Sequence, residues 1–218
     1  MRSTPSPYHN SIEWLQNKRV QKTFESLQKR FFKAIVTENS EGACEIIHGL
    51  VSPPDIVAKG DSASIDEIGI VSSLRQRGHT VIDPFESPQI TFEKLRETLC
   101  VDLFLTSANA VTLNGDIILV DGTGNRVAAT VFGPKKVVIV IGKNKIVDTI
   151  EDGFRRVTSI CAPINWHKFG RTATPCAQTG FCSDCHSPDR SCRVYLTISF
   201  KPRKSDITVI LVKEDLGF

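Results

Sequence analysis

Short apolar runs alternate with amphipathic stretches along most of this 218-residue chain. Runs of β-branched and other apolar residues predict strands, which lie at 56–58, 81–82, 103–105, 136–141, 194–200 and 207–212. Apolar residues recur every three or four positions in the segments that predict helices, which are 11–38, 41–50, 64–77, 91–99 and 147–161. Strands that alternate with helices predict an α/β fold, with a mostly parallel sheet flanked by helices.

A β-hairpin is predicted where this alternation is interrupted. Two apolar runs flank Asn114-Gly115, a dipeptide that readily adopts the positive φ angles of a tight hairpin turn. The second run leads into a glycine-rich loop at 122–126, and residues 127–132 predict a short helix before the next strand. The stretch 106–142 therefore predicts the centre of the α/β domain.

The two ends of the chain differ from this centre. We expect residues 1–50 to form an N-terminal helical extension, because a long basic helix and a second helix precede the first strand. Residues 51–218 then form the α/β domain. Within it, residues 165–193 show no periodicity and predict an irregular, cysteine-rich insertion. A loop of this length in a compact domain is unusual unless something fixes its shape.

Composition places the chain among ordinary globular proteins. Hydrophobic residues make up 40% and charged residues 23%, and the net charge of +3 is spread over the sequence. A weak, dispersed charge argues against nucleic acid as a partner. No run approaches the roughly 18 apolar residues of a membrane span, and the N-terminus lacks the apolar core of a secretory signal. We therefore expect a cytoplasmic protein.

Four of the seven cysteines lie close together in the predicted insertion. Cys176, Cys182, Cys185 and Cys192 have the spacing C-x5-C-x2-C-x6-C, which in a cytoplasmic protein indicates metal or redox chemistry before disulfides. Zinc and a [4Fe–4S] cluster both accept four cysteines. Because one short loop supplies all four thiols, whereas structural zinc sites usually use two separate pairs, the spacing favours an iron–sulfur cluster. Zinc is the alternative, and disulfides or free thiols are a third interpretation.

Two glycine-containing loops are candidate sites for a small anion. Each follows a predicted strand and precedes a predicted helix, where ligands bind in open α/β sheets and where free backbone N–H groups favour anions. The opposing interpretation is that the glycines only form turns and that Ser64 and Glu67 form a capping box. The candidate residues are Gly60, Asp61, Ser62 and Ser64 in the first loop, and Gly122, Thr123, Gly124, Asn125 and Arg126 in the second.

No familiar catalytic motif accompanies these loops. The sequence contains neither Gly-x-Ser-x-Gly nor His-Glu-x-x-His, the signatures of a serine hydrolase and a zinc protease. The catalytic residues are therefore unknown at this level, and whether the protein is an enzyme is left open.

One long stretch carries a resemblance to a known family. The segment TSANAVTLNGDIILVDGTGNRVAATVFGPKKVVIVIG, with AKGDSAS upstream and ITVILVKEDLGF at the end, resembles the LUD-domain family, which includes the lactate-utilisation protein C type. The resemblance covers about residues 10–218. It implies a fold similar to that of ribose-phosphate isomerases and CoA transferases, and a part in lactate oxidation alongside iron–sulfur partner subunits. The four-cysteine loop marks a short subgroup, and the resemblance transfers no catalytic residue.

Three hypotheses for function follow. The leading one is a LUD-type metal-binding accessory or electron-transfer protein, linked to oxidation of lactate or a related organic acid and working with redox partner subunits. The second is an enzyme that binds a phosphorylated or CoA-linked acid in the two loops and carries a structural metal. The third is a regulatory or scaffold protein, for which the long basic helix contacts a partner or a second copy of the chain in a homo-oligomer.

Overall fold

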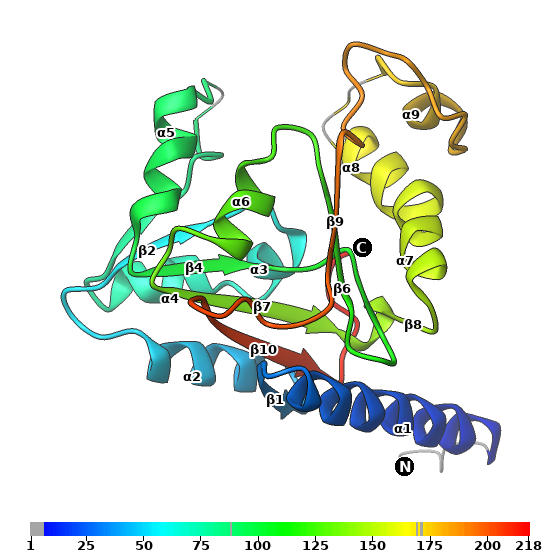
Figure 1. Cartoon of the computed structure of the whole chain (residues 1–218), viewed down its shortest axis with the longest axis horizontal. Coiled ribbons are helices and arrows are strands. Elements are labelled where there is room, and N and C mark those ends of the chain that lie inside the picture. Colours follow the sequence, from blue (N-terminus) through cyan, green and yellow to red (C-terminus); the bar gives the residue numbers. More distant parts are fainter. Residues whose placement is uncertain (1–6, 88, 169, 171) are drawn as a thin grey trace, which may run out of the picture.

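The computed structural model of the protein describes residues 7–87, 89–168, 170 and 172–218. Its largest element is a six-stranded sheet in which every pairing is parallel (Figure 1). In sheet order the strands are β1 (Lys33–Thr37), β10 (Asp206–Val212), β7 (Lys136–Gly142), β4 (Leu103–Thr106), β2 (Ile56–Lys59) and β3 (Thr80–Ile82). The predicted α/β class with a mostly parallel sheet is confirmed.

Helices cover both faces of this sheet. Along the central strand β7, Val137 and Ile139 pack into one hydrophobic cluster, whereas Val138 and Val140 pack into another on the opposite face. Side chains alternate between the faces of a strand, so a strand buried on both faces is apolar throughout. This explains the continuous apolar runs of the sequence.

The helices are short apart from the first. The helix α1 contributes Leu27 to one core cluster, and α2 contributes Ile47 to the other. No helix in the described part of the chain is long and apolar enough to cross a membrane. The helices are α1 (Pro7–Lys29), α2 (Ser40–Leu50), α3 (Ala63–Glu67), α4 (Ile70–Gln76), α5 (Phe92–Glu97), α6 (Asn125–Val131), α7 (Ile150–Arg156), α8 (Ala162–Lys168) and α9 (Pro175–Thr179).

The predicted hairpin belongs to a second, four-stranded sheet. Its strand order is β8 (Ile146–Val147), β5 (Ala110–Thr112), β6 (Ile117–Asp121) and β9 (Val194–Ile198). The antiparallel pair β5–β6 turns at Asn114-Gly115, as predicted, and Gly115 has a φ of +85°. A side chain there would also be crowded, because an added Cβ would lie 3.0 Å from the backbone of Ser26 in α1. The hairpin is therefore held against the first helix.

The predicted helix at 11–38 is too long. The helix α1 ends at Lys29, Phe31 adopts a left-handed φ of +69°, and the chain then forms β1, which pairs with β10. The β-branched run in β1 gains more from this pairing than from a further helical turn. Residues 1–50 are therefore not a purely helical extension, since β1 is an edge strand of the main sheet; residues 1–6 lie outside the described residues.

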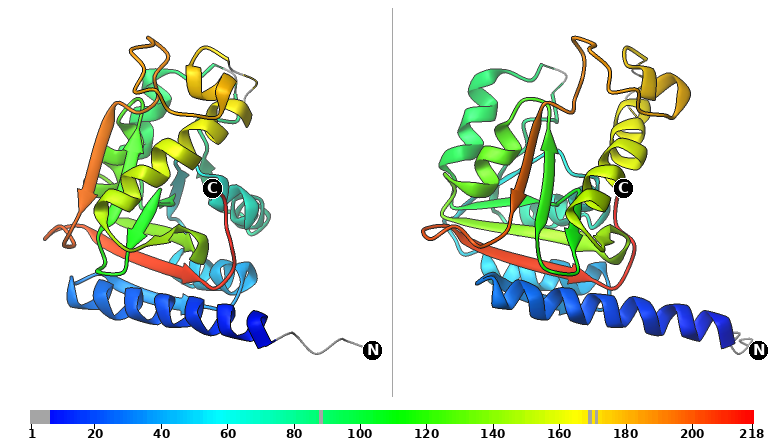
Figure 2. Two further views of the ribbon diagram at one scale, coloured as in Figure 1. Left: turned by 90° about the vertical axis from the view of Figure 1, so that its right-hand side faces the viewer. Right: turned by 45° about the vertical axis from the view of Figure 1, so that its right-hand side comes forward.

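The predicted helix at 147–161 also has the wrong bounds, since it begins at Ile150 and does not end at Cys161. A π-helical turn, Val157–Cys161, joins α7 directly to α8, and Pro163 lies in the first turn of α8. A proline is tolerated in a first helical turn. The predicted irregular insertion at 165–193 thus begins inside a helix and contains α9, while residues 169 and 171 lie outside the described part. Both views of Figure 2 place α9 at the end of the molecule opposite α1.

Candidate functional site

A cleft of about 610 Å³ opens at the carboxyl ends of the main-sheet strands. Its walls include three segments that are distant in sequence, namely the loop after β2, the loop after β6 and the segment Pro188–Arg193 that follows the cysteines. Among the residues expected at a ligand site, those that line it are Asp61, Ser62, Gly122, Thr123, Asn125, Arg126 and Cys192. The fold therefore brings both glycine loops and the end of the cysteine loop to one opening.

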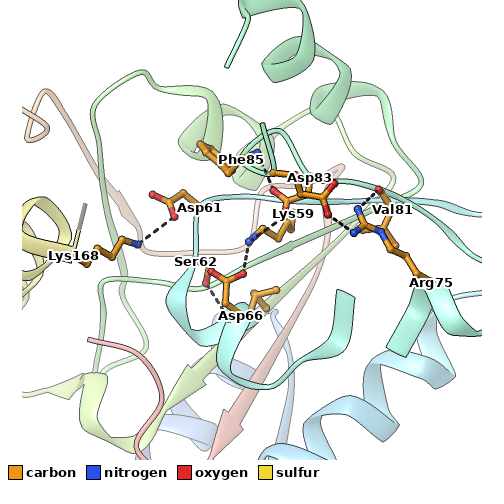
Figure 3. A network of polar contacts seen from close by, with 11 residues as sticks. Lys59, Asp61, Ser62, Asp66, Arg75, Val81, Asp83, Phe85 and Lys168 are labelled. Carbon is orange, nitrogen blue, oxygen red and sulfur yellow. Dashed lines mark hydrogen bonds and ion pairs between the residues drawn. The ribbon is translucent and has the colours of Figure 1, made fainter. Parts of the chain in front are cut away.

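Ion pairs fix the first loop at its base. Lys59, the last residue of β2, is buried, and its ammonium group contacts the carboxylates of Asp66 and Asp83, the latter at 3.4 Å. Figure 3 shows Lys59 between these two partners. A buried lysine needs such partners because desolvation disfavours its charge. The loop that follows, Gly60–Ser64, is thus anchored from within.

The same loop is tied to the opposite wall of the cleft. Lys168, at the end of α8, reaches Asp61 with a nitrogen–oxygen distance of 3.5 Å (Figure 3). Ser62 caps α3, since its hydroxyl oxygen accepts a hydrogen bond from the N–H of Ile65 at 3.3 Å. The alternative capping box is wrong, because Ser64 and Glu67 bond elsewhere, Glu67 accepting from the N–H of Gly217 at 2.6 Å.

The second loop is held by its own side chains. The carboxylate of Asp121 accepts from the N–H groups of Thr123, at 3.2 Å, and Val127, at 3.1 Å. Gly124, with a φ of +93°, begins α6. This helix has seven residues and α3 has five, so their dipoles alone are a weak source of attraction for an anion.

Arg126 lies on the floor of the cleft, where its guanidinium is hydrogen-bonded to other groups of the protein. Its guanidinium donates to the carbonyl oxygens of Ser107 (2.9 Å) and Val120 (2.7 Å), and to Oδ1 of Asn109 (3.1 Å). Desolvation lowers the pKa of this arginine. A Cβ on Gly60 would lie 3.1 Å from its side chain, so the two loops are in close contact. Arg126 joins the loops rather than projecting freely into the cleft.

A buried lysine that the sequence analysis did not identify also lines the cleft. Lys145 is 3% exposed, and its Nζ donates to the hydroxyls of Ser64 (2.7 Å) and Ser107 (3.0 Å). Burial, followed by the nearby charge of Arg156, lowers the pKa of Lys145 to about 8. A perturbed lysine in a cleft is a candidate for binding or catalysis.

Arg156, whose charge acts on Lys145, is also buried. It donates to the carbonyl oxygens of Asn109 (2.9 Å) and Asn144 (3.3 Å), and to the sulfur of Cys161 (3.1 Å). Cys161 closes the π-helical turn and lines the cleft. Such turns occur frequently at functional sites.

The four clustered cysteines border a second, small cavity of about 20 Å³. All seven cysteines of the chain are free thiols. Burial, and more weakly the other three thiols, raises the pKa of Cys192 to about 11. Within the described residues, however, no three His, Cys, Asp or Glu side chains are already placed to coordinate a metal ion. The thiols share a cavity without touching one centre.

Arg190 holds the cysteine loop together. Its guanidinium donates to the carbonyl oxygens of Cys185 (2.8 Å) and Cys192 (2.7 Å), and pairs with the carboxylate of Asp184 at 2.8 Å. Cys192 and Trp166 line both the small cavity and the central cleft. The cysteine cavity and the cleft are therefore neighbours that share a wall.

Comparison with known proteins agrees with this architecture. The sequence pattern described as "LUD domain" matches residues 20–212. A DUF162 family protein from Deinococcus radiodurans superimposes with a TM-score of 0.52 at 16% identity, covering 90% of this chain and 98% of that one, which shows a shared fold. The β subunit of eIF2B from Chaetomium thermophilum gives a TM-score of 0.39 at 14% identity, covering 52% of this chain and 44% of that one. No curated protein sequence matches.

Proposed function

The chain belongs to the LUD-domain family, and we propose that it is a metal-binding redox protein in which Cys176, Cys182, Cys185 and Cys192 hold a [4Fe–4S] cluster. The observation that carries this proposal is that all four thiols border one cavity. Four thiolates are the usual ligand set of such a cluster. Zinc, which accepts the same donors, is the competing occupant.

Arg190 counteracts the burial that opposes the thiolate form of Cys192. The guanidinium of Arg190 lies against the carbonyl groups of two cysteines, so its positive charge offsets part of the negative charge of the thiolates. The segment that carries the cysteines has one helix of five residues, α9. Loop movement that brings the thiols onto one centre therefore breaks little regular structure.

A [4Fe–4S] cluster, when bound, supplies one-electron transfer. The wall shared by the cysteine cavity and the cleft would place a small molecule next to it. Together with the family membership, this supports an accessory or electron-transfer role in the oxidation of lactate or a related organic acid, with redox partner subunits. The chain's own residues would bind and orient that molecule.

The metal content of the protein tests the proposal. Protein purified without oxygen is expected to absorb visible light and to contain iron and sulfide in equal amounts, about four of each per chain. Cys185→Ser should lose most of both. Cys100→Ser is the matched control, because Cys100 is an exposed free thiol outside the cavity, and it should keep them. A colourless protein with one zinc would refute the redox role, and a protein without metal would refute the site.

A further inference from the structure

Three cationic side chains lie at the inner end of the cleft, and the nearby carboxylates of Asp61, Asp121 and Glu67 act on them only through space. Lys145 and Arg156 are buried and Arg126 is partly buried, and their hydrogen-bond acceptors are hydroxyl, carbonyl, amide and thiol groups. In the described ranges of the chain none of the three forms an ion pair with Asp or Glu. Buried charge is costly unless it is paired, and none of these carboxylates forms an ion pair with Lys145, so this end of the cleft favours an anion.

Lys145 has a donor to spare. An ammonium group carries three N–H bonds, and Ser64 and Ser107 accept two of them. The third has no acceptor among residues 7–87, 89–168, 170 and 172–218. Because Lys145 lines the cleft, a bound ligand can accept this hydrogen bond.

We propose that this end of the cleft is an oxyanion-binding site in which Lys145 supplies the counter-charge and the hydrogen bond. The ligand is a small molecule with a carboxylate or phosphate group, and a volume of about 610 Å³ leaves room for the rest of it. Ser64 and Ser107 position the ammonium group, and Arg126 and Arg156 add positive potential. The site does not depend on a metal in the cysteine cavity.

Above about pH 8, binding at this site takes up a proton. The charged groups that act on Lys145 are Arg156 of α7 and Arg126 of α6, which lower its pKa, and Cys161 and Glu67, which raise it. With burial dominant, the pKa of Lys145 is about 8, so near that pH half of the free protein holds a neutral amine. An oxyanion binds the ammonium form and draws the equilibrium towards it.

The test measures the affinity of the whole chain for acetate and, separately, for inorganic phosphate, by calorimetry. Acetate stays ionised over the range used, so its affinity should be constant near pH 7 and fall about tenfold per unit above pH 8. Phosphate at neutral pH shows which oxyanion the site prefers. Lys145→Met should abolish binding, and Ser107→Ala should weaken it several-fold.

Lys143→Met is the matched control, because Lys143 lies in the same turn but does not line the cleft. It should bind as the unmodified protein does, and thermal unfolding verifies that each variant is folded. Cys185→Ser should also bind, which separates this proposal from the metal site. Failure of both probes to bind, or binding by Lys145→Met equal to that of the control, would overturn the proposal.

Discussion

Lys145 makes the stability of the protein depend on pH. The pKa of this group is about 8 in the folded chain against a reference of 10.5, so between these values the unfolded chain binds more protons. The free energy of unfolding therefore rises with pH between about 8 and 10.5. Below this range the full cost of burying the charged lysine is present. Relative to Lys145→Met, the free energy of unfolding should rise by about 3 kcal/mol from pH 8 to pH 10.5. Urea unfolding at several pH values measures this free energy for the two proteins. If it changed with pH equally in both, a lowered pKa of Lys145 would be contradicted.

At the residue scale the sequence locates loops better than it locates the groups that meet in them. The residues Gly60–Ser64 and Gly122–Arg126 could be placed because each loop lies between a recognisable strand and helix. Lys145 could not, since a lysine in a short polar turn usually faces water. Its burial comes from Ser64 and Ser107, which are 81 and 38 positions away in sequence.

The first helix is bound to the fold by packing. Leu27 of α1 is fully buried in the core, whereas Leu15 of the same helix is 54% exposed. Leu27→Ala should lower the free energy of unfolding by about 2–5 kcal/mol. Leu15→Ala is the matched control and should change it by about 0.5 kcal/mol or less. Equal effects in chemical unfolding would contradict the packing of α1 and revive the hypothesis that this helix serves mainly a partner.

At the element scale, apolar periodicity identified the buried strands but assigned the edge strand β1 to a helix. The helical spacing of apolar residues continues through Phe31 and Ile35. This segment forms a strand because β1 pairs with β10, from the other end of the chain. The second sheet could not be predicted for the same reason, because β9 pairs with β6 across a long sequence distance. Local patterns carry no information about such pairings.

At the scale of the whole molecule, the fold joins two features that the sequence shows separately. The cysteine spacing identified the four-cysteine cluster, and the order of strands and helices identified the glycine loops. Their shared wall depends on α8 continuing through Pro163 and carrying Trp166 to both cavities. A molecule in the cleft would therefore lie beside the cysteine loop.

The most direct test of this arrangement is the electron paramagnetic resonance spectrum of the chemically reduced protein, recorded with and without acetate. We expect an iron–sulfur signal that changes on adding acetate, because Cys192 lines both cavities. In Lys145→Met the signal should persist and no longer respond. A metal centre beside the cleft would be contradicted if the reduced protein gave no iron–sulfur signal. It would also be contradicted if acetate bound but left the signal unchanged.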